Sequence, residues 1–157
     1  MSRVGLGFDS HTFDSGRPLI LGGVVIPGGP GLSGHSDADV LSHAIADALL
    51  GAARLGDLGT MFPPDDRWRG ASSLDILKTT AQALRHNGCR IENIDATVIA
   101  QSPKLAPHRT GMTTAIARAL DLAQSEVSIK ATTTDGLGFT GRGEGIAAIA
   151  VALVHPS

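Results

Sequence analysis

The chain has 157 residues and a formal net charge of −2 at pH 7, and 42% of its residues are hydrophobic against 18% charged. This size and balance are typical of one globular domain with a sizeable core, so we expect a single domain over residues 1–157. The near-neutral charge argues against nucleic acid as a partner, and the lone cysteine, Cys89, excludes an intrachain disulfide. The N-terminus has no signal-peptide pattern and the longest apolar run is too short for a membrane helix, so we expect a cytoplasmic protein without a membrane partner.

The first predicted element is a strand over residues 3–8, which ends in Asp9-Ser10-His11. Side chains two residues apart in an extended chain point to the same side. Asp9 and His11 therefore form a pair of candidate metal ligands. By itself an Asp-x-His triplet is a weak signal, because most such triplets bind nothing.

A turn at residues 14–18 follows, and then two short apolar runs at residues 19–21 and 24–26. Gly22-Gly23 between them predicts a β-hairpin. We expect the Gly- and Pro-rich residues 27–34 to form a mobile loop.

A helix is predicted from about residue 40 to residue 55, with Ser36 or Asp37 as its N-cap. Three polar side chains share a face beside its main apolar face: Asp39, His43 and Asp47. Burying such groups unpaired is costly, so they need a partner such as a cation; a satisfied core histidine beside surface acids is the alternative. His43 together with Asp9 and His11 gives two imidazoles and a carboxylate, a set that suits zinc with an open fourth position.

Residues 56–69 are irregular and could form a substrate loop or a plain surface connection. The remaining predicted elements are a helix over 72–87 with a capping-box-like start at Ser72, a strand over 91–100, a loop over 101–108, a helix over about 107–122, and strands over 127–134 and 146–154. This order predicts an α/β (α+β) fold, a mixed β-sheet with helices packed on one face. The last strand lacks polar alternation, so both of its faces should be buried, one of them by a neighbouring subunit.

The glycine-rich residues 136–145 contain a match to G-x-G-x-x-G at Gly136–Gly141. A dinucleotide-binding site would need a following helix and strand, and too few residues remain for both. The segment could instead cradle phosphates through backbone N–H groups and nearby side chains, or form a tight hairpin. The side chains in question are Thr132, Thr133, Thr140 and Arg142.

Several short motifs, taken together and in this order, resemble the 2-C-methyl-D-erythritol 2,4-cyclodiphosphate synthase family of the non-mevalonate pathway of isoprene biosynthesis. They are Gly7–His11, His35–Asp39 with His43, Gly56–Gly59, Pro103-Lys104, and Lys130–Thr134 through Gly138–Gly145. The resemblance implies a lyase that releases CMP from 4-diphosphocytidyl-2-C-methyl-D-erythritol 2-phosphate, by attack of the 2-phosphate on the β-phosphorus. It also implies a homotrimer with active sites between subunits. A zinc-dependent nucleotide-diphosphate hydrolase, in which water attacks instead, is the alternative.

The resemblance further implies zinc bound by Asp9, His11 and His43, a second divalent ion (Mg²⁺ or Mn²⁺) bound by Asp135, and transition-state stabilisation by His35 and Thr133. The implied substrate-binding residues are Asp9, Ser10, His11, His35, Ser36, Asp57, Leu58, Gly59, Phe62, Pro63, Pro64, Asp65, Asp66, Ala100, Gln101, Ser102, Pro103, Lys104, Leu105, Ala106, Thr132, Thr133, Thr134, Asp135, Phe139 and Arg142.

Three positions depart from the family pattern. Ala38 stands where glycine is common, and Pro63-Pro64-Asp65-Asp66 lacks or shifts the first acid of a Pro-Asp-x-Asp loop. Asp135 replaces the usual glutamate and is one methylene shorter. These departures bear on the second metal and on the loop rather than on the zinc ligands.

Overall fold

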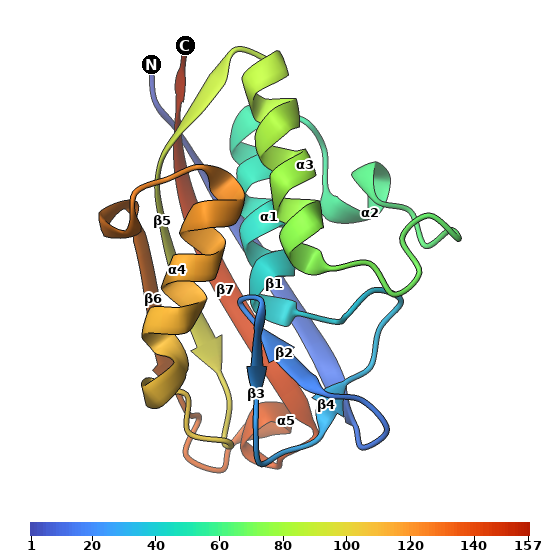
Figure 1. The fold of residues 1–157 in the computed structure, drawn as a ribbon. Helices are drawn as coiled ribbons and strands as arrows, with labels where there is room; N and C mark the ends of the chain where they lie inside the picture. Colours follow the sequence, from blue (N-terminus) through green and yellow to red (C-terminus); the bar gives the residue numbers. More distant parts are fainter.

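The computed structural model describes all 157 residues and contains a five-stranded sheet in the order β4-β1-β7-β5-β6 (Figure 1). The strands of this sheet are β1 (Arg3–Asp14), β4 (Gly31–Leu32), β5 (Cys89–Ile99), β6 (Val127–Thr132) and β7 (Gly145–Pro156). A separate antiparallel hairpin consists of β2 (Leu19–Leu21) and β3 (Val24–Ile26), as predicted.

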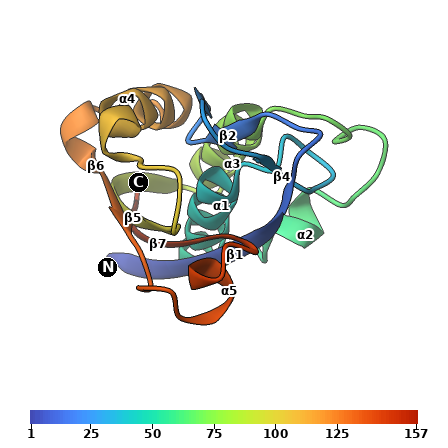
Figure 2. The same ribbon diagram turned by 90° about the horizontal axis from the view of Figure 1, so that it is seen from below.

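The helices are α1 (Val40–Ala53), α2 (Leu58–Met61), α3 (Ser73–His86), α4 (Arg109–Leu120) and α5 (Gly138–Gly141), with short 3₁₀ turns at Ala106–His108 and Gln124–Glu126. The three long helices α1, α3 and α4 cover one face of the sheet, and only the one-turn α5 lies on the other side (Figure 2). No helix combines the length and the apolar character needed to cross a bilayer. The prediction of a mixed sheet with helices on one face is confirmed.

Pairing within the sheet is mixed, and its register decides which residues meet at each end. β7 is antiparallel to both β1 and β5, whereas β5 and β6 are parallel and are joined through α4. His11 on β1 lies opposite Ile146 at the start of β7. Ile99, at the end of β5, pairs with Ala147 on one side and with Thr132 on the other. The C-terminal ends of β1, β5 and β6 therefore lie at the same end of the sheet.

Helix α1 lies directly on the backbone of β1. A Cβ atom added to Gly5 or Gly7 would lie only 1.9 Å from the carbonyl oxygen of Ala48 or Ala44, respectively. Such distances are far inside van der Waals contact, so only glycine is possible at these two positions without moving the helix. The alanines of α1 that face the strand are fully buried.

The two faces of β7 differ in exposure within a single chain, and the face expected to be covered by a neighbouring subunit is the exposed one. Ile146, Ala150 and Val154 are buried beneath the helices, but Ile149 and Val151 on the other face are 39% and 37% exposed. The reason is that a single chain has no long helix on that side of the sheet (Figure 2).

Several segments expected to be irregular contain regular structure. The loop over residues 27–34 includes β4, which pairs with β1; residues 56–69 include α2, and the glycine-rich residues 136–145 include α5. The first strand also continues beyond residue 8 to Asp14. These elements were missed because each is at most one turn or two residues long, or interrupts a hydrophobic alternation.

The predicted N-cap of α1 was wrong, whereas the N-cap of α3 is Ser72 as predicted but lacks the expected side-chain hydrogen bond. Asp39 is the N-cap of α1, where its carboxylate accepts the backbone N–H of Ser42, so it does not share a cation with His43. At the start of α3 the Ser72 side chain makes no capping hydrogen bond. The Ser73 N–H is bound instead by the carboxylate of Asp37, from a segment distant in sequence.

Candidate metal centre and substrate cavities

Asp9, His11 and His43 converge at this end of the sheet, and their ligand atoms all lie within 4.8 Å of one another. His11 Nε2 is 2.8 Å from Asp9 Oδ2, and His43 Nδ1 is 3.1 Å from the same oxygen. The two ring nitrogens are 3.3 Å apart. The extended backbone of β1 points Asp9 and His11 to the same side, as the sequence predicts, and the first turn of α1 brings His43 over them.

Electrostatics within this cluster favour a charged carboxylate. Burial acts to raise the pKa of Asp9, but hydrogen bonds from His11 and His43 outweigh it and lower the pKa to about 2. Burial likewise acts to lower the pKa of His11, while the hydrogen bond and the negative charge of Asp9 leave it raised above its ordinary value. An anionic oxygen and two imidazoles thus share one small volume, which is the situation that a bound cation relieves.

The far side of the His43 ring is also occupied. His43 Nε2 lies 2.9 Å from Ser73 Oγ and 3.1 Å from Ser36 Oγ. His43 as a whole is only 6% exposed. The His43 imidazole is therefore fixed on both edges, with Nδ1 toward Asp9 and His11 and Nε2 toward two hydroxyls.

A cavity of about 210 Å³ opens beside these three side chains. Predicted site residues that line it are Asp9, His11, His35, Ser36, His43, Leu58, Phe62 and Pro64. Trp68 and Ile76 also line it and were not predicted. Trp68 packs edge-on against Phe62, with ring centroids 4.7 Å apart. An aromatic residue in a polar loop was the available signal for Trp68, whereas Ile76 is indistinguishable in sequence from an ordinary core residue.

The segment that carries His35 and Ser36 is held by Arg17. Its guanidinium donates one N–H to the Gly34 carbonyl at 2.5 Å and another to the Ser36 carbonyl. The His35 ring nitrogen Nε2 lies 2.6 Å from the Asp65 carbonyl, which connects this segment to the loop after α2. The sequence contains no signal for Arg17, because its partners are backbone carbonyls.

A second cavity, of about 220 Å³, lies at the end of β5 and β6. It is lined by Ala100, Gln101, Pro103, Lys104, Leu105, Ala106, Ala131, Thr132 and Thr133, all but Ala131 being predicted site residues. The sheet order places its two strands, β5 and β6, two and three strands from His11, or roughly 10 and 14 Å at about 4.8 Å per strand. Within one chain, the two groups of predicted residues therefore line separate cavities at the same end of the sheet.

The residues after β6 form a polar turn beside the second cavity. Asp135 has a left-handed backbone (φ 52°), and its carboxylate accepts the Thr133 hydroxyl at 3.1 Å. Thr134 is tied into the turn by its hydrogen bond to the Leu137 carbonyl. Arg142 pairs with Glu144 at 2.9 Å, which raises the pKa of the Arg142 guanidinium. No second carboxylate joins Asp135, so the chain alone provides a single acidic ligand there.

Other predicted site residues line neither cavity. Ser10 is exposed on the opposite side of β1 from Asp9 and His11, as strand alternation requires. Asp57 is the N-cap of α2, where it accepts the Thr60 N–H at 2.8 Å. The others that line neither cavity are Gly59, Pro63, Asp65, Asp66, Ser102, Thr134, Asp135, Phe139 and Arg142.

Comparison with known proteins identifies the family. A model described as the YgbB family matches residues 2–155. The chain belongs to the YgbB family. It is 56% identical over 154 residues to the 2-C-methyl-D-erythritol 2,4-cyclodiphosphate synthase of Pelotomaculum thermopropionicum, covering 98% of this chain and 95% of that protein. It is 55% identical to the protein of the same name from Geobacillus kaustophilus, with both chains fully covered.

Two solved structures that superpose on this chain have the same fold. The bifunctional IspDF of Campylobacter jejuni superposes with a TM-score of 0.96 at 44% identity, over 100% of this chain and 43% of that one. This YgbB-family chain thus spans less than half of the bifunctional protein. A Plasmodium falciparum IspF solved as a CDP complex superposes with a TM-score of 0.86 at 33% identity, over 99% of this chain and 97% of that one.

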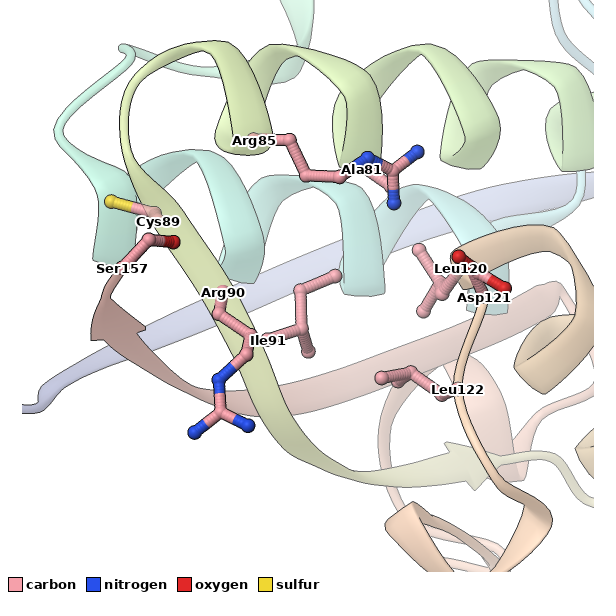
Figure 3. Close-up of a pocket in the computed structure, with 9 residues that line it drawn as sticks. All are labelled: Ala81, Arg85, Cys89, Arg90, Ile91, Leu120, Asp121, Leu122 and Ser157. Carbon is pink, nitrogen blue, oxygen red and sulfur yellow. The ribbon is translucent and has the colours of Figure 1, made fainter.

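This YgbB-family chain has a further cavity, of about 330 Å³, between α3, α4 and the start of β5 (Figure 3). Its floor is apolar, with Ile91, Leu120 and Leu122, and the Arg85 side chain extends from α3 toward it. Cys89 at this end pairs with Pro156, ten residues along β7 from the partner of His11, which is roughly 33 Å away. It contains none of the predicted site residues and is remote from the metal centre.

Proposed function

We propose that the chain converts 4-diphosphocytidyl-2-C-methyl-D-erythritol 2-phosphate into 2-C-methyl-D-erythritol 2,4-cyclodiphosphate and CMP. The observation that carries this proposal is identity of 56% and 55%, over nearly the full length of both chains, to relatives named for this product. The intact Asp9–His11–His43 cluster beside a cavity adds support, because a chain that had lost the activity would not be constrained to keep it.

Zinc is the metal that the donor set fits best. At ligand distances of about 2.0–2.1 Å, two neighbouring ligands in a tetrahedral zinc site are about 3.3 Å apart. The three separations in the Asp9–His11–His43 cluster are 2.8, 3.1 and 3.3 Å, so one ion can contact all three atoms with little movement. Bound there, zinc would act as a Lewis acid toward a phosphoryl oxygen, at a fourth position that the protein leaves open.

In the proposed reaction an oxygen of the 2-phosphate forms a bond to the β-phosphorus, and the bond from that phosphorus to the CMP oxygen breaks. Little covalent chemistry is required of the protein, which has to bring two phosphates of one substrate together and stabilise charge. His35 and Ser36 lie in the cavity beside the metal ligands and are assigned the methylerythritol phosphate. Lys104, Thr132 and Thr133 line the second cavity and are assigned the cytidine diphosphate.

A second divalent ion, Mg²⁺ or Mn²⁺, is assigned to Asp135. Magnesium is commonly held by one or two carboxylates together with substrate phosphates, so a single acidic ligand is sufficient when the diphosphate is present. The Asp135 carboxylate lies beside Thr133, the residue assigned to transition-state stabilisation. Gly136 follows with φ 80°, a backbone conformation that leaves this turn free to adjust to the shorter acid.

The proposed active form is a homotrimer in which each active site lies between two subunits. Val4, Leu6 and Phe8 of β1 are 68%, 66% and 53% exposed on the face of the sheet that lacks long helices. Together with Ile149 and Val151 of β7 they form an apolar surface of the kind that marks a protein interface. Association through this face would also cover Ser10 and bring the metal cavity of one chain near the polar turn of another.

Phosphorus NMR of the purified protein, incubated with the cytidylyl substrate, zinc and Mg²⁺, tests the proposal directly. We expect CMP and a cyclic diphosphate in equal amounts. Running the reaction in ¹⁸O-enriched water separates the alternative, because a hydrolase would put the label into a linear bisphosphate, whereas internal attack incorporates none. Release of CMP with a labelled linear product would replace the proposed reaction with hydrolysis.

A further inference from the structure

The His43 ring is connected to a carboxylate that does not touch the metal ligand set. Ser73 Oγ lies 2.9 Å from His43 Nε2, and the same hydroxyl donates a hydrogen bond to Asp37 Oδ1. Asp37 also accepts the Ser73 backbone N–H through its other oxygen, at 2.9 Å. Ser73 is fully buried. The order of contacts is therefore Asp37, Ser73, His43 and then the cluster with Asp9 and His11.

The direction of these hydrogen bonds follows from the number of protons. A carboxylate only accepts, and a serine hydroxyl has one proton to donate. Because that proton goes to Asp37, Ser73 Oγ has only lone pairs to offer His43, so Nε2 has to carry a hydrogen and donate it. An imidazole that binds a metal is neutral and has one N–H, so a hydrogen on Nε2 leaves Nδ1, the atom that faces Asp9 and His11, as the nitrogen that can bind the metal.

We propose that Asp37 and Ser73 are positioning residues of the metal centre. Through the Ser73 hydroxyl, Asp37 holds His43 in the Nε2–H tautomer and presents Nδ1 as the ligand atom. The inference rests on the proposed metal-dependent function, but it concerns residues that are neither metal ligands nor assigned to substrate. Ser36 Oγ, 3.1 Å from the same nitrogen, is not bonded to a carboxylate and cannot by itself select the tautomer.

The connection also links the metal centre to the substrate loop. Ser73 is the first residue of α3 and follows directly on the segment that contains Phe62 and Trp68. Asp37 binds the end of that segment a second time, since its backbone N–H donates to the Ala71 carbonyl at 3.0 Å. Removal of either side chain is thus expected to loosen both the ligand ring and the end of the loop.

The test is zinc affinity, measured by competition with a chromophoric chelator, for Ser73→Ala and Asp37→Asn. Loss of a partner that orients a metal-ligating histidine typically lowers affinity about 10- to 100-fold, and we expect a loss in this range for both variants. Ser72→Ala is the matched control, because the neighbouring Ser72 side chain makes no capping hydrogen bond. The control should bind zinc within about twofold of the parent.

A second measurement reports the tautomer without metal or turnover. Long-range ¹H–¹⁵N spectra of the metal-free protein should show a hydrogen on His43 Nε2 in the parent and partial loss of that hydrogen in Ser73→Ala. The positioning role is overturned if Ser73→Ala keeps both the parent's zinc affinity and the parent's hydrogen on Nε2. If the parent binds no zinc but His43 Nε2 still has a hydrogen that Ser73→Ala removes, the metal assignment fails while the hydrogen bonds from Asp37 through Ser73 to His43 stand.

Discussion

Arg17 donates a guanidinium N–H to the Gly34 carbonyl at 2.5 Å, and so fixes the backbone immediately before His35. Hydrogen bonds from a charged group are worth about 1.5–3 kcal/mol each. Replacing Arg17 with leucine should therefore loosen the segment assigned to the methylerythritol phosphate. We expect kcat/KM to fall by about tenfold or more, since about 1.4 kcal/mol corresponds to a factor of ten.

Zinc content separates this effect from damage to the metal centre, and Arg17→Leu should retain the parent's content. Arg118→Leu, on an exposed position of α4, is the control and should leave both activity and zinc unchanged. An Arg17→Leu enzyme with the parent's kcat/KM would show that the contact with Gly34 has no part in catalysis.

His43→Ala removes one of three converging ligand atoms and leaves a carboxylate and one imidazole. Purified parent protein should contain about one zinc per chain, as expected for a site with three protein ligands. The variant should contain almost none by atomic emission. His108→Ala, in the 3₁₀ turn before α4, removes a histidine outside the cluster and should keep the full content. Full zinc occupancy in His43→Ala would refute the ligand assignment.

The exposed face of β1 predicts the oligomeric state. Sedimentation should give a trimer for the parent, and Leu6→Asp should dissociate it, because a charge would then be buried in an apolar interface. Val25→Asp is the matched control, since Val25 is similarly exposed (63%) but lies on the β2–β3 hairpin away from the sheet. A parent that is monomeric and active would contradict the proposed sharing of sites between subunits.

Asp135 is predicted to serve the second metal and not the first. Asp135→Asn should lower the rate of CMP release by about 10²-fold or more and weaken its dependence on Mg²⁺, because electrostatic stabilisation at a phosphoryl group is removed. Its zinc content should be unchanged, and Asp135→Glu should recover most of the rate. Asp121→Asn is the control, as Asp121 is also an exposed aspartate with a left-handed backbone. Parent-like Mg²⁺ dependence in Asp135→Asn would remove this residue from the site.

Asp39 is predicted to be a stability residue. Its buried carboxylate accepts the N–H groups of Gly22, Gly23 and Ser42, so it joins the β2–β3 turn to the start of α1. Asparagine would place an amide donor against one of these donors, and we expect a loss of about 1–3 kcal/mol in the free energy of unfolding. Urea denaturation measures this, with the exposed Asp75→Asn as control. Equal midpoints for the two variants would contradict the bridging role.

The parts of the fold that the sequence predicts are those with a long periodic signal or a strong turn residue. Strand alternation placed Asp9 and His11 on one side, and the Gly22-Gly23 pair located the hairpin. The acceptor of the Ser73 N–H at the start of α3 could not be found in this way, because it is Asp37, remote in sequence. The role of Arg17 could not be predicted from the sequence for the same reason, because its partners are backbone carbonyls that come near it only in the folded chain.

The close contact between α1 and β1 determines how far apart the metal ligands lie. Asp9 and His11 belong to the strand and His43 to the helix, so the spacing of the ligands is set by how near the two backbones come. At Gly5 and Gly7 that approach leaves no room for a single carbon atom. A substitution at Gly7 would therefore act as a change of metal affinity and selectivity, although glycine has no side chain with which to bind an ion.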